Sequence, residues 1–208
     1  RTSVLLAQPF LAETARLLEA RGATLIPSLF PFGAEGTMAF MQAGASAFGI
    51  APAHVDSALA PAYARAQKAI AAHRPQLAGK RVMFFPDSQL EPPLARFLAR
   101  ECGMIPLEVG TPYLHRTHLA AELAALPHDA TLVEGQDVDA QLDRCRAMRP
   151  DITVCGLGPA NPLEAEGLTT KWTIELVFSP IHGFDQAGDL AGLFARPLNR
   201  AALLAGGR

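Results

Sequence analysis

Short apolar runs alternate with helix-spaced apolar residues along the second half of the chain. The runs are typical of strands buried on both faces of a sheet, and they occupy residues 81–85, 105–109, 131–134, 152–155 and 172–178. Apolar residues at three- and four-residue steps predict helices over 89–102, 118–126, 138–148 and 187–195. This alternation predicts an α/β fold, with a parallel sheet covered by helices on both faces and joined by right-handed crossovers.

The first half of the chain has fewer strand-like runs. The pattern predicts strands at 3–8 and 24–27 and helices at 11–20, 36–48 and 52–74. The helix at 52–74 is rich in alanine and amphipathic, and we expect an interruption at Pro61 and an end near Pro75 and Gly79.

These elements suggest how the chain divides. Two strands and two helices are too few for a domain, so we expect residues 1–50 to be the end of a preceding α/β domain. Residues 51–79 are expected to connect it to a complete domain at residues 80–208. The chain has no initial Met, and a strand-like run begins at Val4. This favours a segment of a longer protein over a trimmed terminus.

Composition excludes several classes of function. The net charge of -2 gives no electrostatic argument for binding nucleic acid. No apolar run approaches the roughly 20 residues of a membrane helix, and no signal peptide is visible, so a cytoplasmic protein without a membrane span is expected. The three cysteines, Cys102, Cys145 and Cys155, are widely spaced and are expected to be small buried side chains in a reducing compartment.

The first strand-turn-helix of the complete domain lacks the residues of a nucleotide site. A dinucleotide fold needs glycines there, yet none occurs between Arg81 and Glu101, and no GxxxxGK[ST] loop is present. We therefore exclude NAD binding and direct ATP binding by this segment. Asp87 and Ser88 follow the strand and either cap the next helix or touch a ligand. His115 and His118 are expected to be surface histidines, because no carboxylate or cysteine lies near them in the sequence.

The stretch from Gly156 to Asp185 is the strongest candidate for a binding site. It follows the buried strand at 152–155, and ligands of open parallel sheets bind outside the carboxyl ends of strands. It holds the only tryptophan of the chain, Trp172, close to the expected edge of the sheet, where the indole is either core or a flat apolar wall. His182 lies in a loop and either bonds backbone groups or contacts a ligand or a neighbouring subunit.

Three runs of residues carry a resemblance to a known family. They are KRVMFFPDSQLEPPLARFLARECGM (80–104), VEGQDVDAQLDR (133–144) and CGLGPANPLEAEGLTTKWTIELVFSPIHGFDQAGDLAGLFARPL (155–198). These runs resemble the N subunits of the dark-operative (light-independent) protochlorophyllide reductases, a branch of the nitrogenase-like family. The likeness covers nearly the whole chain, and the TTKW and IHGFD segments are its most specific parts.

The resemblance implies a nitrogenase-component-like fold of three Rossmann-like domains. Residues 1–50 would then be the end of the second domain, and residues 80–208 would be the complete carboxyl-terminal one. It also implies an oxidoreductase in which N and B subunits form an N2B2 heterotetramer with a 4Fe-4S cluster between N and B. A separate ATP-hydrolysing iron-sulfur protein, subunit L, would deliver electrons. The cluster would pass them to protochlorophyllide, whose C17=C18 double bond is reduced to give chlorophyllide.

The chain departs from the family at the cluster. The family's N subunits hold the cluster with three cysteines of their amino-terminal domain, together with an Asp of the B-type subunit. The positions of Cys102, Cys145 and Cys155 do not match, so we assign no metal ligand to this segment and expect the cluster cysteines upstream.

The resemblance also implies what this segment contributes to the site. Nitrogenase holds its metal cofactor with a His just before its HGFD-like segment, whereas no His lies between Lys171 and Ile181. This fits an apolar wall for a tetrapyrrole. Trp172 is its first candidate, with Phe178, His182 and Phe184 after it.

The sequence leaves the catalytic residues unknown and keeps two alternatives open. One is a non-catalytic nitrogenase-like scaffold or assembly module, and the other is the related chlorophyllide reductase, which acts on a different ring.

Overall fold

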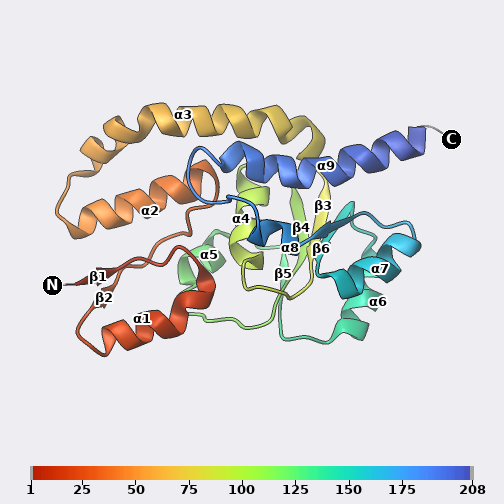
Figure 1. The fold of residues 1–208 in the computed structure, drawn as a ribbon, viewed down its shortest axis with the longest axis horizontal. Coiled ribbons are helices and arrows are strands. Elements are labelled where there is room, and N and C mark those ends of the chain that lie inside the picture. The colour runs from red at the N-terminus through yellow and green to blue at the C-terminus, as the bar shows by residue number, and fades with distance from the viewer. Residues whose placement is uncertain (1, 207–208) are drawn as a thin grey trace.

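The computed structural model describes residues 2–206, in which five parallel strands form a central sheet (Figure 1). The strands are β3 (Arg81–Phe84), β4 (Ile105–Thr111), β5 (Thr131–Glu134), β6 (Ile152–Cys155) and β7 (Thr170–Trp172). They are ordered β5-β4-β3-β6-β7, and every neighbouring pair is parallel. The predicted α/β fold with a parallel sheet is therefore confirmed, and β7 is an edge strand as expected.

Helices cover both faces of this sheet, as predicted. Helices α4 (Glu91–Arg100) and α5 (Ala120–Ala125) pack on one face, and α6 (Val138–Met148) and α7 (Leu157–Ala165) pack on the other. The side chains of β3 alternate accordingly. Val82 and Phe84 join the core on the α4 face, whereas Met83 joins the core on the α7 face.

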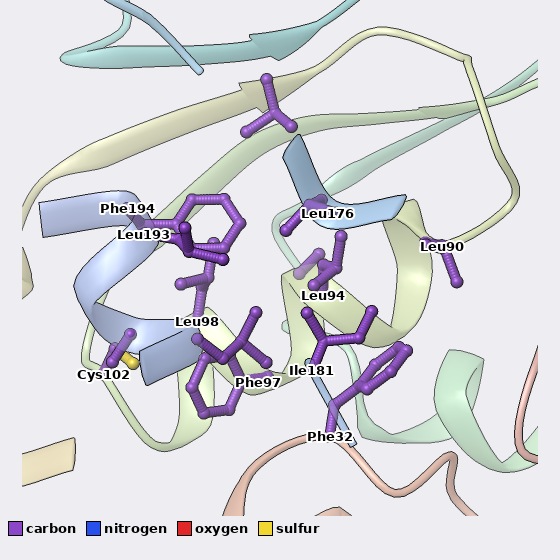
Figure 2. Close-up of a cluster of buried hydrophobic side chains, with 14 of the residues drawn as sticks. Phe32, Leu90, Leu94, Phe97, Leu98, Cys102, Leu176, Ile181, Leu193 and Phe194 are labelled. Carbon is purple, nitrogen blue, oxygen red and sulfur yellow. The ribbon is translucent and has the colours of Figure 1, made fainter. Parts of the chain in front are cut away.

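The larger core lies between the sheet, α4 and the last helix, α9 (Ala187–Gly206). Figure 2 shows that α4 and α9 bring their apolar faces together there, while single residues of other segments close the side of the cluster. The labelled side chains include Phe97 and Leu98 of α4, Leu193 and Phe194 of α9, and Phe32, Leu176 and Ile181. Burying each of these phenylalanines contributes about 1.5–3 kcal/mol, so this cluster is a main source of stability.

The first fifty residues form a smaller unit beside the sheet. Its strands β1 (Ser3–Val4) and β2 (Thr24–Leu25) pair in parallel but not with the large sheet. Its helices are a short 3-10 turn (Pro9–Leu11), α1 (Ala12–Glu19) and α2 (Gly33–Ala47). The long helix α3 (Pro52–Leu77) follows and packs along α9 (Figure 1).

One predicted strand is wrong. The run at 172–178 is not a strand: β7 ends at Trp172, and a short helix, α8 (Ile174–Val177), follows. The ladder stops because the Thr173 hydroxyl donates to Asp87, in the loop after β3. The amide of Leu176 then donates to the Thr173 carbonyl at 2.9 Å, which closes a helical turn.

Prolines interrupt fewer helices than expected. Helix α3 continues through Pro61 and Pro75, and α9 continues past Pro197, although its end was expected before that proline. A proline removes one helical hydrogen bond, at a cost of about 3 kcal/mol in an isolated helix. In both helices this cost is offset by the packing of α3 along α9.

A buried ion pair attaches the amino-terminal unit to the sheet domain. Arg96 of α4 and Glu122 of α5 are both fully buried and are joined by an Nε–Oε2 contact of 2.8 Å. The Arg96 guanidinium also donates to the carbonyls of Phe30 and Phe32, and the Glu122 carboxylate accepts the amide of Phe30 at 2.7 Å. Each charge thus has several partners, which is the condition under which a buried ion is tolerated.

Replacing Arg96 with leucine is expected to lower the free energy of unfolding by about 3–5 kcal/mol, because Glu122 would stay buried without its partner. Urea unfolding followed by circular dichroism measures this loss. The matched control is Arg146→Leu, which removes an ion pair with Glu166 on the exposed side of α6. That pair is solvated, so a much smaller loss is expected. Equal losses in the two variants would contradict the role given to Arg96.

Glu101, at the end of α4, makes the same junction sensitive to pH. Its carboxylate accepts the amides of Ala34 and Glu35 at the start of α2, at 2.6 and 3.1 Å, and it faces the Arg96 guanidinium. Burial raises the pKa of Glu101 from 4.5 to about 7, against the lowering effect of these hydrogen bonds and of Arg96.

The folded chain therefore holds the Glu101 proton more tightly than the unfolded chain. The resulting stability is fully present below pH 4.5 and is lost as pH rises toward about 7, by at most about 3 kcal/mol. We expect Glu101→Gln to remove this part of the pH dependence when unfolding is measured at steps between pH 4.5 and 8. An unchanged slope in the variant would show that other groups cause it.

Candidate functional site

The order of the sheet reverses between β3 and β6, and the loops after these strands lead to opposite faces. Helix α4 follows β3 on one face and α7 follows β6 on the other. In open α/β sheets ligands bind in the crevice that opens at such a point, outside the carboxyl ends of the strands. The residues at this end of β3, β6 and β7 therefore form the first candidate site.

A carboxylate of the chain fills the phosphate position of this crevice. Glu91, at the start of α4, is only 1% exposed, and its Oε1 accepts the amides of Asp87 and Ser88 at 2.9 and 2.7 Å. In nucleotide-binding folds a phosphate occupies this place, at the start of the first helix. In this chain the Glu91 carboxylate takes that place. Burial raises the pKa of Glu91, although these hydrogen bonds lower it.

The same loop contains a strained residue. Gln89 has a φ of 67°, a left-handed conformation that side chains other than glycine rarely adopt. Ser88 donates its amide to Glu91, and the Ser88 hydroxyl accepts the amide of Leu90 at 3.4 Å. The polar groups of Ser88 are therefore used in holding the loop and starting α4.

Asp87 links the crevice to the end of β7. Its Oδ2 accepts the hydroxyl of Thr173, although the two residues are 86 positions apart. A side chain at Gly156 would stand 3.2 Å from the other oxygen of Asp87, so the glycine after β6 leaves room for this carboxylate. Asp87 therefore fixes the start of α8 over the switch between the strands.

Several residues at or just after the carboxyl ends of β6 and β7 carry exposed apolar side chains. We call this group the apolar shelf, and its members are Leu157, Trp172, Ile174, Val177 and Phe178. Trp172 is 36% exposed and Phe178 is 82% exposed. Ile174, Val177 and Phe178 share one face of the α8 turn by their three- and four-residue spacing, while Leu176 points into the core (Figure 2). Exposed apolar groups of this kind mark binding surfaces.

The indole of Trp172 is held from one side. Its Nε1 donates to Oε1 of Glu164 in α7 at 3.1 Å, and the hydroxyl of Thr170 donates to the same oxygen. Thr170 and Trp172 are two positions apart in β7, so both side chains point toward α7. The orientation of the indole at the sheet edge is thus set by this chain alone.

The opposite side of β7 carries a buried cation. Lys171 is only 3% exposed, and its ammonium group pairs with Glu175, four positions further along the chain. Burial lowers the pKa of Lys171, against the raising effect of Glu175. The Lys171–Glu175 pair and the Thr173–Asp87 hydrogen bond anchor α8 at two points.

A groove of about 740 Å³ lies near the other end of β7. It is lined by the start of the strand, by Glu164 and by the last turns of α9, including Arg200. The apolar shelf does not line it, since the shelf follows the carboxyl ends of the strands. Glu164 is the residue that borders both the groove and the indole.

Two of the four predicted site residues point into the protein. His182 contacts Gln8 at 2.8 Å and the Ala7 carbonyl at 3.2 Å through its Nε2, and its ring lies 5.0 Å from that of Phe32. Burial lowers its pKa, against the raising effect of the Ala7 carbonyl. Phe184 packs edge-on against Tyr63 of α3, with ring centroids 6.3 Å apart. These contacts attach the loop after α8 to the amino-terminal unit through His182 and to α3 through Phe184, whereas Trp172 and Phe178 belong to the apolar shelf.

The described residues do not suit an iron-sulfur cluster or a simple metal site. No group of three or more His, Cys, Asp or Glu side chains within residues 2–206 is placed to hold a metal ion. The three cysteines Cys102, Cys145 and Cys155 are all buried, and burial raises the pKa of each thiol, that of Cys155 to about 12. His115 and His118 stack with ring centroids 4.0 Å apart and have no third ligand nearby in that part of the chain.

Within residues 2–206, no helix combines the length and the apolar character that crossing a membrane requires.

The sequence did not identify several residues of the site. Leu157 was not singled out, and Ile174 and Val177 escaped notice because the run at 172–178 has the composition of a strand, although the spacing of 174, 177 and 178 also fits one helical face. The sequence does contain a signal for Glu91, because Ser88-Gln89-Leu90-Glu91 is a capping-box pattern. No sequence pattern indicates Glu164, because its role depends on a contact with the neighbouring strand.

Replacing Thr173 with valine is expected to loosen α8, because the hydrogen bond to Asp87 is lost while the volume is kept. Amide hydrogen exchange should show the Leu176 amide exchanging about tenfold faster or more, as expected for the loss of a hydrogen bond to a charged group. Asp87→Asn is the matched control, since its side-chain oxygen still accepts the hydroxyl. Equal exchange rates in wild type and Thr173→Val would show that α8 is held by other contacts.

Comparison with known proteins identifies related sequences. Residues 2–199 match the family model of nitrogenase component 1 type oxidoreductases. The chain is 68% identical over 204 residues to the light-independent protochlorophyllide reductase subunit N of Bradyrhizobium sp. (strain ORS 278), a match that covers 98% of this chain and 48% of the relative. It is 66% identical to the subunit N of Rhodospirillum rubrum, over 98% of this chain and 46% of that protein. The chain thus spans about half the length of the curated relatives it matches.

Solved structures show the same fold. A structure of nitrogenase Cp1 at pH 5 superposes with a TM-score of 0.76 at 14% identity, covering 96% of this chain and 47% of that one. A structure of nitrogenase Cp1 at pH 6.5 superposes with a TM-score of 0.73 at 19% identity, covering 96% and 45%. At these identities the likeness concerns the fold alone.

Proposed function

Because this chain belongs to the nitrogenase component 1 type oxidoreductase family, we propose that it is the carboxyl-terminal part of subunit N of a light-independent protochlorophyllide reductase. The observation that carries the proposal is the identity of 66–68% to proteins of that name over 98% of the chain. The chemistry of the apolar shelf also supports the proposal, because the shelf offers a flat organic molecule an exposed aromatic surface.

The proposed reaction is the ATP-dependent reduction of the C17=C18 double bond of protochlorophyllide to chlorophyllide. It consumes two electrons and two protons per double bond. The proposed partners are the B-type subunit, in an N2B2 heterotetramer, and an ATP-hydrolysing iron-sulfur protein, subunit L, that supplies the electrons. A 4Fe-4S cluster of the full complex would pass them on. No group of side chains within residues 2–206 is placed to hold a metal ion, and the proposal therefore puts the ligands of that cluster in other parts of the complex.

The contribution of this chain is binding and exclusion of water. A tetrapyrrole is a wide, flat and largely apolar ring, and most of its binding free energy comes from burial of its faces. Trp172 and Phe178 are proposed to contact the ring, and His182 and Phe184 to hold the loop that follows α8. The B-type subunit would close the other side of the pocket, because the shelf is open in this chain alone.

Trp172→Ala is the direct test in the assembled complex. Removing a contact of this size should weaken protochlorophyllide binding by about 10- to 100-fold, from the 1.5–3 kcal/mol that a buried large side chain contributes. Pigment titration and turnover measure the effect. The control is Phe48→Ala, since Phe48 is 81% exposed but lies at the far end of α2. Unchanged affinity and turnover in Trp172→Ala would remove Trp172 from the pocket.

Offering different pigments to the wild-type complex tests the substrate. Turnover of protochlorophyllide in preference to chlorophyllide supports the proposal, whereas preference for chlorophyllide would assign the chain to the related reductase. A complex that contains no iron and binds neither pigment would instead indicate a scaffold or assembly module.

A further inference from the structure

We propose that Glu164 is a positioning residue that fixes the plane of the Trp172 indole and so sets the surface presented to a flat ligand. The part of this inference that concerns the ligand rests on the proposed function. The part that concerns the indole stands on the geometry of α7 and β7 alone.

The Glu164 carboxylate is placed by the rigid sheet. Glu164 lies in the last turn of α7 and is exposed, so its side chain would be mobile if it had no partner. Its Oε1 instead accepts the hydroxyl of Thr170. Thr170 is buried in β7 and lies opposite Thr153 of β6, which makes it a fixed donor.

The second donor to Oε1 is the indole of Trp172, with Nε1 at 3.1 Å. The indole N–H lies in the plane of the ring and cannot accept, so a hydrogen bond to a fixed oxygen restricts both torsions of the side chain. A bond to a charged acceptor is also stronger than a neutral one. One carboxylate thus connects the α7 helix, the buried Thr170 and the exposed indole.

Helix capping does not account for the Glu164 side chain. The end of α7 is closed by backbone bonds, in which Glu166 donates to the Pro162 carbonyl and Gly167 donates to the Glu164 carbonyl. Its neighbour Glu166 shows the usual role of a surface carboxylate here, since it pairs with Arg146. Glu164 has no cationic partner among the described ion pairs of residues 2–206 and is directed at the strand instead.

The single tryptophan allows a direct measurement on the chain. Glu164→Ala is expected to lower the steady-state anisotropy of the indole emission and to broaden its lifetimes, because the ring is released. Glu164→Gln keeps an acceptor oxygen and should restore values close to wild type. Glu166→Ala, which breaks the ion pair with Arg146, should leave the emission unchanged. Equal anisotropy in wild type and Glu164→Ala, with both folded by circular dichroism, would overturn the inference.

A double-mutant cycle in the assembled complex tests the use of this contact. Trp172→Phe keeps an aromatic face but has no N–H, so it cannot bond Glu164. Glu164→Ala should weaken protochlorophyllide binding by about three- to tenfold in the wild-type background, as expected for one hydrogen bond, and by less than about twofold in the Trp172→Phe background. Equal effects in both backgrounds would show that Glu164 does not act through the indole.

The two experiments separate the inference from the proposed function. If the anisotropy falls as expected while Trp172→Ala leaves pigment affinity unchanged, then Glu164 positions the indole and the pigment assignment is wrong. If Trp172→Ala weakens binding while Glu164→Ala leaves both anisotropy and affinity unchanged, then the pigment assignment stands and the positioning role is overturned.

Discussion

The attachment of the amino-terminal unit through Arg96 is the constraint on which the rest of the structure depends. A two-stranded sheet with short helices cannot bury a core of its own, so it must pack on the sheet domain. Arg96 makes this possible because it satisfies the carbonyls of Phe30 and Phe32 inside the protein. A side chain at Gly36 would stand 2.4 Å from the Phe30 carbonyl and 2.5 Å from the guanidinium, so the close approach requires glycine there. Phe32 then packs against His182, which holds the loop after α8.

The fold was largely predictable, because strands buried on both faces of a parallel sheet are continuous apolar runs. The runs at 131–134 and 152–155 match β5 and β6, and the placement of Trp172 at a sheet edge is also confirmed. The strand predicted at 172–178 is absent for a physical reason. Its composition suits a strand, but the bond from Thr173 to Asp87 and the pair of Lys171 with Glu175 bend the chain into α8. The bond from Thr173 reaches a residue 86 positions away, so it overrides local propensity and cannot be inferred from the neighbouring sequence.

The candidate site was predictable only in part. Aromatic residues near the carboxyl end of a strand are visible in a sequence, and Trp172 and Phe178 are both exposed there. His182 and Phe184 lie in the loop that follows and were candidates for the same reason. Their side chains instead contact Gln8 and Tyr63, which lie far away in the chain. Sequence patterns report which residues share a loop, but not which side of the loop faces solvent. Glu164 illustrates the same limit, because its role arises from one oxygen shared by two residues of the next strand.

The polar groups around the apolar shelf restrict what it can hold. Asp87, Glu164 and Glu175 are all carboxylates, and each has a donor from the chain itself: Thr173, Trp172 and Lys171, in that order. Their hydrogen-bonding capacity is thus directed at holding β7 and α8 in place. Only one of the three donors is a cation, so the surroundings of the shelf favour neutral or positive groups of a ligand. A flat ligand that carries acidic substituents would therefore lie with its apolar face on Trp172 and with its acids directed away from this rim.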